Sequence, residues 1–312
     1  MSNLLQFDRL EGITLPARPL HLAIGMFDGV HLGHQFVIDS AVHSARRSGG
    51  LAGVLTFWPH PSALFRPENP TALLMPVEMK RQVLAELGID FVIEQNFSRE
   101  FAGIEAGDFV QFLRRNLPQL SAIYVGDNFR FGRGRKGDVS TLVEEGKKLG
   151  VTVYGAERLT HNGEPISSSR IRGLLVAGDI VEANALLGYS YFAEGVVERG
   201  RQLGRTIGFP TLNIAWEPEL KPRFGVYAVD VLDAAGTRCT GVASYGTRPT
   251  VEAAGRPILE VHLLEDSVLT YGDKVRVNWL HFLRPESKFE SMDEMKKQIV
   301  LDAENARRLL AK

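Results

Sequence analysis

The sequence predicts two domains of different classes: an α/β domain built on a mainly parallel sheet, and an antiparallel β-barrel that ends in a helix. The chain of 312 residues is long enough for two hydrophobic cores. Up to about residue 186, strand-like apolar runs alternate with segments of helical period. After Gly188 the chain changes to extended segments separated by turn residues. We therefore expect domains at residues 1–186 and 187–312.

In the first domain each strand-like run is followed by a helix-like segment, which is the pattern of a parallel sheet covered by helices. The expected strands are Leu20–Ile24, Leu51–Phe57, Phe91–Glu94, Ala122–Gly126 and Val151–Gly155. The expected helices are Gly33–Ser48, Val77–Leu87, Asp108–Leu117, Leu142–Leu149 and Ser168–Ala177. The first helix illustrates the signal, because Phe36, Val37 and Ala41 recur at the spacing of one helical face.

The second domain is expected to form a barrel because short extended segments follow one another without intervening helices. These segments are Tyr191–Val197, Gly225–Leu232, Arg238–Ser244, Ile258–Leu264 and Lys274–Phe282. A helix closes the chain, and Ser291 and Glu294 mark its start with the spacing of a capping box.

The composition is that of a globular protein, with 44% hydrophobic and 23% charged residues. A formal net charge of −1 gives no reason to expect nucleic acid or a membrane as a partner. The single cysteine, Cys239, excludes internal disulfides and fits a reducing compartment. No run of eighteen apolar residues occurs, so we expect a cytoplasmic protein. Nothing in the sequence indicates an oligomeric state.

The segment from Gly25 to His34 joins the first expected strand to the first expected helix. In an open α/β sheet, ligands bind beyond the carboxyl ends of strands, where a helix N-terminus attracts phosphate. Glycines at 25, 29 and 33 allow the backbone to approach a ligand. His31 and His34 can direct ring nitrogens at one anionic centre, as nucleotidyl transfer requires. The alternative for this histidine pair is a metal site.

Three further segments of the first domain follow expected strands or start a helix. Thr56–Pro61 has two prolines that stiffen the segment, and its Trp58 could either stack on a planar ring or pack partly buried under a loop. Val125–Gly137 combines four cations, four glycines and two phenylalanines, and by itself it indicates RNA as readily as ATP. Ile166–Arg172 places serines at a helix start with arginines behind them, which suits both helix capping and phosphate binding.

The second domain has its strongest signal between Gly200 and Asn213. Glycines at 200, 204 and 208 permit a backbone that wraps phosphate oxygens, although the spacing is not that of a Walker loop. Thr211 and Asn213 present two oxygens on one face of an extended segment, which is a plausible Mg²⁺ platform. A kinase also needs a general base, and Glu260, inside the apolar run Pro257–Leu264, is either an ordinary solvent-facing glutamate or that base.

Taken together, these motifs resemble a known family along nearly the whole chain. The string G-x-F-D-G-x-H-x-G-H is similar to the class I nucleotidyltransferase signature and to the N-terminal module of bacterial bifunctional riboflavin kinase/FAD synthetases. V-G-D-N-F-R-F-G, I-S-S-S-R-I-R, G-F-P-T-L-N, G-T-R-P-T, E-V-H-L and F-L-R-P-E-S-K-F resemble further motifs of that family. The resemblance implies a Rossmann-like nucleotidyltransferase sheet followed by a riboflavin kinase barrel, with Glu260 as catalytic base.

The family's roles carry over to matching positions. For the adenylyltransferase, the resemblance implies catalysis by His31 and His34 and flavin binding by Pro59, His60, Pro61 and Phe129. It implies ATP binding there by Gly25, Phe27, Asp28, Gly33, Asn128, Ser168, Ser169 and Arg172. For the kinase it implies ATP binding by Gly204, Arg205, Gly208, Pro210, Thr211 and Asn213. Thr211 and Asn213 would also hold Mg²⁺, and Arg284 and Phe289 would contact flavin.

The expected activity is therefore ATP-dependent phosphorylation of riboflavin to FMN, followed by adenylylation of FMN to FAD with release of pyrophosphate. Two positions depart from the family pattern. Trp58 stands where Asp is usual before Pro-His-Pro, and Ser244-Tyr245 replaces a segment that usually has Asn two residues before the glycine. The alternatives are an enzyme with one working module, a protein that binds flavin or nucleotide without turnover, and an RNA-binding protein using Arg130 to Lys136.

Overall fold

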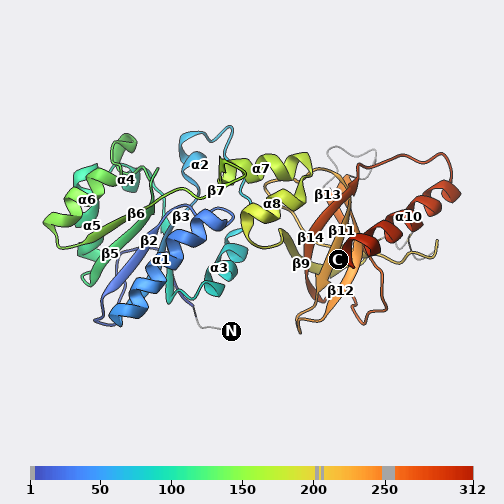
Figure 1. Ribbon diagram of the computed structural model, residues 1–312, viewed down its shortest axis with the longest axis horizontal. Coiled ribbons are helices and arrows are strands. Elements are labelled where there is room, and N and C mark those ends of the chain that lie inside the picture. Colours follow the sequence, from blue (N-terminus) through green and yellow to red (C-terminus); the bar gives the residue numbers. More distant parts are fainter. Residues whose placement is uncertain (1–3, 201–203, 205–206, 248–256, 312) are drawn as a thin grey trace. The chain divides into compact units, whose positions relative to one another are not determined.

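The computed structural model describes residues 4–200, 204, 207–247 and 257–311. The chain divides into two compact units, Met1–Ser168 and Ser169–Lys312 (Figure 1). This division comes earlier in the chain than the expected boundary after residue 186, because two short helices that precede the barrel fall in the second unit. These helices are α7 (Ser168–Ala177), whose first residue belongs to the first unit, and α8 (Ile180–Leu187).

The first unit contains a six-stranded sheet in the order β1-β4-β3-β2-β5-β6, and every pairing in it is parallel. Its strands are β1 (Leu5–Phe7), β2 (Leu20–Ile24), β3 (Leu51–Trp58), β4 (Phe91–Asn96), β5 (Leu120–Gly126) and β6 (Thr152–Ala156). The five expected strands are confirmed within one to two residues at most ends. The edge strand β1 was missed, since three residues are too few for periodicity to show.

Helices connect the strands from β2 to β6, as is usual in a parallel sheet. The helices of this unit are α1 (Leu32–Ser48), α2 (Pro61–Phe65), α3 (Val77–Glu86), α4 (Arg99–Ala102), α5 (Phe109–Asn116) and α6 (Val139–Lys148). Two 3₁₀ turns, at Ala106–Asp108 and Arg133–Arg135, and the hairpin of β7 (Thr160–His161) with β8 (Glu164–Pro165) complete the unit. In Figure 1 helices cover the sheet of this unit.

The core of the first unit lies between sheet and helices, and its central strands are apolar on both faces. All of β2 is buried, and Leu22, Leu55 and Ile123 on three neighbouring strands have at most 1% exposure. Gly53 on β3 leaves space for the Phe91 ring, which a methyl group at Gly53 would overlap. Since β2 pairs with β3 on one side and β5 on the other, the strand order reverses at β2. Ligands bind at such a switch point in open α/β sheets.

The second unit contains a closed barrel in the order β10-β13-β12-β11-β14-β9, and every pairing is antiparallel. The strands are β9 (Phe192–Glu198), β10 (Leu212–Ile214), β11 (Gly225–Leu232), β12 (Arg238–Thr247), β13 (Pro257–Leu263) and β14 (Lys274–Arg284). The barrel class and its five expected strands are confirmed. The sixth strand, β10, comes from the segment where an extended backbone was expected around Thr211 and Asn213.

Aromatic rings fill the barrel, and Tyr245 is one of them. Tyr245 is fully buried, with ring centroids 5.3 Å from Trp216 and 5.4 Å from Trp279. The preceding Ser244 is exposed, because successive residues of a strand point to opposite faces. Ser244, which stands where the family usually has Asn, therefore lies on the outer face directly opposite Glu260, whereas Tyr245 belongs to the barrel core.

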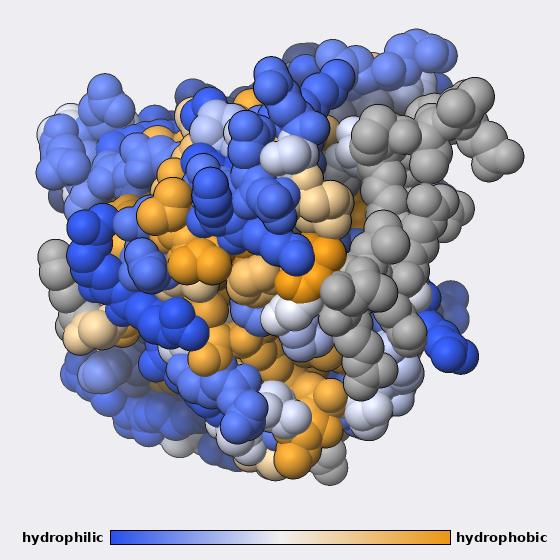
Figure 2. Space-filling view, turned by 90° about the vertical axis from the view of Figure 1, so that its right-hand side faces the viewer, coloured by the Kyte–Doolittle hydropathy of each residue, from blue (hydrophilic) through white to orange (hydrophobic). Residues whose placement is uncertain are grey.

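The terminal helix α10 (Met292–Leu310) begins as expected, with Ser291 Oγ accepting from Glu294 N at 3.2 Å. It packs on the barrel through buried Ala303 and Ala306. Asp302 of the same helix is 3% exposed and binds the Arg284 guanidinium of β14 through Nε and Nη2 at 2.8–3.1 Å. Figure 2 views this end of the molecule, where apolar surface lies between polar side chains.

Two candidate nucleotide sites

The loop after β2 is sharply bent and closes onto its own core. Phe27, Gly29 and Val30 have φ values of 50°, 78° and 36°, a region that strongly favours glycine. Phe27 is 2% exposed and its ring meets His34 edge-on at 5.3 Å. Phe27 thus supports the histidine loop from beneath, and only its backbone remains available to a nucleotide.

The two predicted catalytic histidines stack on each other at the start of α1. Their ring centroids are 3.6 Å apart with an interplanar angle of 16°. His31 is the N-cap of α1, and its Nδ1 accepts from His34 N at 3.3 Å. An accepting Nδ1 leaves the proton of a neutral imidazole on Nε2. The structure therefore brings both histidines to a helix N-terminus, as the sequence predicted.

Burial keeps this pair uncharged. His31 is 5% exposed, and desolvation lowers its pKa to about 4. The pKa of His34 is lowered well below its usual range by burial first and then by the charges of His31 and Lys80. Nδ1 of His34 is buried and has no hydrogen-bond partner among the described residues. At neutral pH the pair is thus a set of neutral donors at a helix N-terminus, where the helix dipole favours an anion.

Asp28 and Ser168 close one side of the same loop. Asp28 is 5% exposed, and its Oδ1 accepts from Leu74 N at 2.9 Å. Ser168, the first residue of α7, donates from Oγ to the Asp28 carbonyl at 2.9 Å. The structure therefore brings these two predicted ATP-binding residues together. Ser169 and Arg172 follow on α7.

The segment after β3 lies next to the histidine loop, as expected for neighbouring parallel strands. His60 is the N-cap of α2, and its Nδ1 accepts from Ser62 N at 3.1 Å. Trp58 is 45% exposed. A small pocket opens between the two loops, and its lining residues are Met26, Asp28, Phe57, Trp58, His60, Leu73, Met75, Val77 and Lys80.

The loop after β5 carries the third set of predicted residues. Phe131 is 6% exposed and packs against Phe109 at 5.0 Å, while Phe129 stacks on Phe131 at 5.6 Å. These rings anchor the loop to the core and leave Asn128 exposed. Of the expected cations, Arg130 pairs with Asp138 at 3.1 Å and Arg133 with Glu105 at 2.9 Å. Carboxylates that pair with these cations weaken the RNA alternative.

Lys80 on α3 was not among the residues predicted for either site. This lysine is 7% exposed and lies on the same helical face as buried Val83 and Leu84. The signal was present, since Lys80 occupies the i−3 and i−4 positions of an apolar face. A lysine there usually reaches water with its charged end. Here it points into the protein, beneath the histidine loop.

In the barrel, strand register assembles the second candidate site. Asn213 of β10 pairs directly with Glu260 of β13, and Glu260 pairs directly with Ser244 of β12. Directly opposite residues share a face and have Cβ atoms about 5 Å apart. Leu259 and Val261 beside Glu260 have 0% exposure and point into the barrel. Glu260 therefore lies on the outer face of the barrel, together with Asn213.

The loop before β10 is held against this face. His262 Nδ1 lies 2.9 Å from the Pro210 carbonyl oxygen, and the His262 ring meets Phe209 edge-on at 5.5 Å. Phe209 N donates to the Gly204 carbonyl at 2.8 Å. A methyl group at Gly200 would overlap the Asn213 side chain, so glycine is required there for close approach. Arg205 lies outside the described residues, as do Arg248, Pro249 and Thr250 of the expected G-T-R-P-T loop.

Arg284, predicted to contact flavin, is engaged in the barrel's own packing through Asp302. Its guanidinium also lies 5.7 Å from the Phe289 ring centroid, which brings together the two residues predicted for flavin binding. The neighbouring Glu286 carboxyl lies where a side chain on Gly246 would project. Desolvation raises the pKa of Glu286. These contacts fix the segment after β14 against the end of β12.

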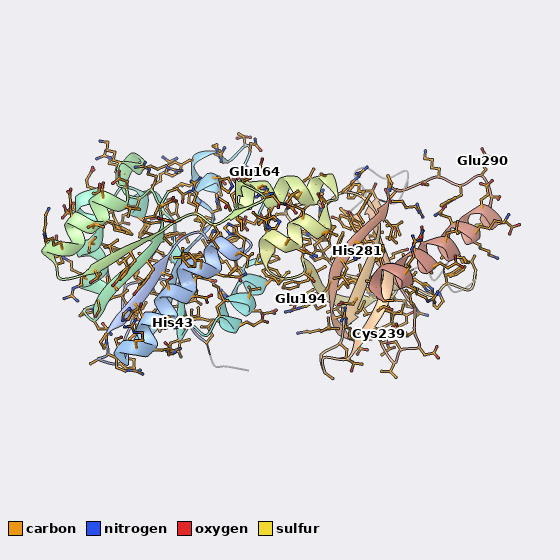
Figure 3. The ribbon with its side chains drawn as sticks, in the orientation of Figure 1. His43, Glu164, Glu194, Cys239, His281 and Glu290 are labelled. Atoms are coloured by element: carbon orange, nitrogen blue, oxygen red, sulfur yellow. The ribbon has the colours of Figure 1, made fainter. Side chains whose placement is uncertain are left out.

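Within the described residues, no group of three or more histidine, cysteine, aspartate or glutamate side chains could hold a metal ion. Cys239 lies on β12 (Figure 3). Thr211, Asn213 and Glu260 offer hydroxyl, amide and carboxylate oxygens, which is the donor set that Mg²⁺ prefers. In the described part of the chain, no helix has the length and apolarity to cross a membrane.

The first unit is a parallel sheet whose switch point carries a loop and a helix N-terminus suited to binding phosphate. The second is a barrel with a carboxylate on its outer face. Together they indicate a two-domain nucleotide-dependent transferase. The FAD synthetase family profile matches residues 15–170, and the riboflavin kinase family profile matches residues 187–310. The chain belongs to the bifunctional riboflavin kinase/FMN adenylyltransferase family. Flavin cofactor synthesis, through FMN and then FAD, is its function.

Individual relatives agree along nearly the whole chain. The bifunctional riboflavin kinase/FMN adenylyltransferase of Escherichia coli K12 is 38% identical over 92% of this chain and 91% of its own. The protein of the same description from Bacillus subtilis is 37% identical over 91% of this chain and 90% of its own. A crystal structure titled macrolide-efflux protein from Streptococcus pneumoniae matches with a TM-score of 0.88 and 27% identity, covering 97% of this chain and 98% of the other.

Proposed function

We propose that the two reactions use two separate sites, with riboflavin phosphorylated on the outer face of the barrel and FMN adenylylated at the histidine loop. One observation in each unit carries this proposal. In the barrel it is the register that sets Glu260 directly opposite Asn213. In the sheet unit it is the stacked pair of His31 and His34 at a helix N-terminus.

In the kinase reaction, Glu260 accepts the proton of riboflavin's primary hydroxyl as that oxygen attacks the γ-phosphorus of ATP. The new O–P bond forms FMN, and the bond between the γ-phosphorus and the β-bridging oxygen breaks to release ADP. A positioned general base contributes roughly 10²- to 10⁴-fold to such a step. Thr211 and Asn213 would hold Mg²⁺, which when bound neutralises phosphate charge. Gly204, Gly208 and Pro210 belong to the loop proposed to receive the ATP phosphates, and Arg205, outside the described residues, is proposed to bind ATP as well.

In the adenylylation reaction, a phosphate oxygen of FMN attacks the α-phosphorus of ATP, and pyrophosphate leaves. His31 and His34 donate hydrogen bonds to the α-phosphate as its charge develops, a role that neutral imidazoles at a helix N-terminus can fill. Ser168, Ser169 and Arg172 carry the family motif that holds the departing pyrophosphate. Gly25, Phe27, Asp28, Gly33 and Asn128 contact the rest of ATP, the buried Phe27 through its backbone.

The flavin ring is expected to lie beside the proline-rich segment in one unit and beside the segment after β14 in the other. Pro59, His60 and Pro61 are proposed to line the first position, and Phe129, on the loop after β5, is proposed to contact the same ring. Trp58, exposed at the small pocket, is available to stack on the ring. In the barrel, Arg284 supports Phe289 while Asp302 holds its guanidinium in place. The cytoplasm, which keeps thiols such as Cys239 reduced, is the proposed location.

The test is product analysis with purified full-length variants supplied with riboflavin, ATP and Mg²⁺. Wild type is expected to yield FMN and then FAD. Glu260→Gln should lose FMN formation by at least about 100-fold yet still convert added FMN to FAD. Its matched control is Glu304→Gln, an exposed glutamate of α10, which should behave as wild type.

The histidine half of the proposal has its own variant and control. His31→Ala should lose FAD formation and keep FMN formation. His43→Ala removes an exposed histidine from the same helix (Figure 3) and should change neither reaction. Equal loss of both reactions in His31→Ala or Glu260→Gln, with folding intact, would contradict the division of labour. FMN accumulating alone from wild type would favour the alternative of one working module, and absence of any turnover would favour a binding protein.

A further inference from the structure

Lys80 is a buried cation in the adenylyltransferase unit to which the mechanism above gives no part. It projects from α3 to the underside of the histidine loop and lines the small pocket together with Met26, Asp28 and His60. Only 7% of the residue is exposed. Burying an ammonium group is costly unless the charge is paired or used.

The contacts of Lys80 tie three elements together. Nζ donates to Thr56 Oγ1 at 3.0 Å and lies 3.4 Å from the Met26 carbonyl oxygen. Thr56 Oγ1 itself donates to the Met26 carbonyl at 3.0 Å. Met26 belongs to the loop after β2, Thr56 to β3 and Lys80 to α3. The ammonium group therefore fixes the start of the histidine loop against its neighbouring strand.

The charge of Lys80 is not neutralised by an ion pair in the described part of the chain. Its two hydrogen-bond partners are a hydroxyl and a carbonyl, which are neutral. Two carboxylates act on Lys80 through space and do not contact it: Glu94 binds the guanidinium of Arg81 through both oxygens, and the buried Asp28 accepts from Leu74 N. A positive charge thus stays beneath a loop that is built for phosphate, with one ammonium N–H beyond the two used.

We propose that Lys80 is a positioning residue for adenylyl transfer. Its ammonium group holds the histidine loop at Met26, and its buried positive charge pairs with a phosphate of the substrate. This inference rests on the proposed adenylylation at the histidine loop. The phosphate could be that of FMN or those of ATP. A phosphate bound at the loop would give the ammonium group a charged partner in direct contact, which no carboxylate of the described residues provides. Removal of the charge should therefore weaken substrate use in the sheet unit and leave the barrel reaction unaffected.

The groups that face Lys80 define how this role depends on pH. Burial lowers the pKa of Lys80 to about 8, while Glu94 and Asp28 act to raise it and Arg81 to lower it. His34, from α1, is also near and stays neutral above acid pH. Loss of the Lys80 proton above this pKa removes the positive charge. The kcat/KM for adenylylation, which reports the free enzyme, should therefore fall above about pH 8.

The experiment compares Lys80→Met and Lys80→Arg with wild type as full chains, converting FMN and ATP to FAD between pH 6 and 10. Lys80→Met should lower kcat/KM about 10- to 100-fold, which corresponds to the loss of one charge-assisted hydrogen bond. Its kcat/KM should no longer fall above pH 8. Lys80→Arg should retain most activity, with the decline moved above pH 10, since a guanidinium stays protonated. A larger rise in KM for FMN assigns the charge to the FMN phosphate, and a larger rise for ATP assigns it to the ATP phosphates.

Controls separate this inference from its premises. Lys148→Met removes an exposed lysine that pairs with Glu145 in the same unit, and it should match wild type. FMN formation by the barrel, measured in each sample, reports that the chain is intact. An undiminished Lys80→Met, or an alkaline decline near pH 8 that persists in Lys80→Arg, would overturn the role of Lys80. If Lys80→Met fails to fold, the pH profile of Lys80→Arg decides alone. Failure of wild type to form FAD would instead overturn the proposed function.

Discussion

His31 combines two roles that a pair of substitutions can separate. As the N-cap of α1, its Nδ1 accepts a backbone hydrogen bond from His34 at 3.3 Å. As a proposed catalytic group, it offers Nε2–H to the α-phosphate. His31→Ala removes both functions. His31→Asn keeps an acceptor in the place of Nδ1, because the asparagine amide oxygen is among the best N-cap groups, but it has no counterpart of Nε2.

The expected magnitudes follow from these contacts. Loss of an N-cap costs about 1 kcal/mol, so His31→Asn should be more stable than His31→Ala by about that amount. For a unit of this size the difference corresponds to about 2–4 °C in melting temperature. Loss of one preorganised donor to a developing oxyanion lowers the rate about 10²- to 10³-fold. Both variants lack Nε2, so both should lose FAD formation to a similar extent.

The assays are urea unfolding followed by circular dichroism, and single-turnover conversion of FMN and ATP to FAD. Agreement requires that stability differ between the two variants while their adenylylation rates stay within a few-fold of each other. If His31→Asn regained most of the wild-type rate, His31 would serve the site only through the helix cap. The assignment of a direct role to its imidazole would then be wrong.

Three further outcomes test the packing around the two sites. Asp302→Asn should destabilise the barrel by about 3 kcal/mol, because it leaves the Arg284 guanidinium without its buried carboxylate, and the urea midpoint of the barrel transition measures this. Gly53→Ala should destabilise the sheet unit by about 1–3 kcal/mol, since the added methyl overlaps the Phe91 ring, and a thermal melt in which it matched wild type would contradict this packing. Lowering the pH from 6.5 towards 4 should destabilise the sheet unit, because the unfolded chain binds protons at His31 and His34 that the native state does not; urea midpoints across this range should fall less in His31→Asn, where only the His34 contribution remains of the two.

The sequence was sufficient for five strands of the sheet, for five strands of the barrel and for the longer helices. Strict local patterns explain this success: the apolar run at Leu20–Ile24 and the helical spacing after it bracket the histidine loop, and glycines and prolines mark the turns. The strand β1 was not predicted because it has only three residues. The buried position of Lys80 was not predicted because a lysine on an apolar helix face normally reaches solvent with its charged end.

Periodicity and motif spacing, then, determined by themselves the two fold classes, the loop that starts α1 and the donor types at each site. Tertiary structure alone decided which side chains meet. The stacking of His31 on His34 and the pairing of Asn213 with Glu260 depend on loop closure and strand register. The physical reason is the separation of the interacting residues along the chain. A local pattern fixes which face of an element a residue occupies, whereas packing between segments far apart in the chain selects its partner.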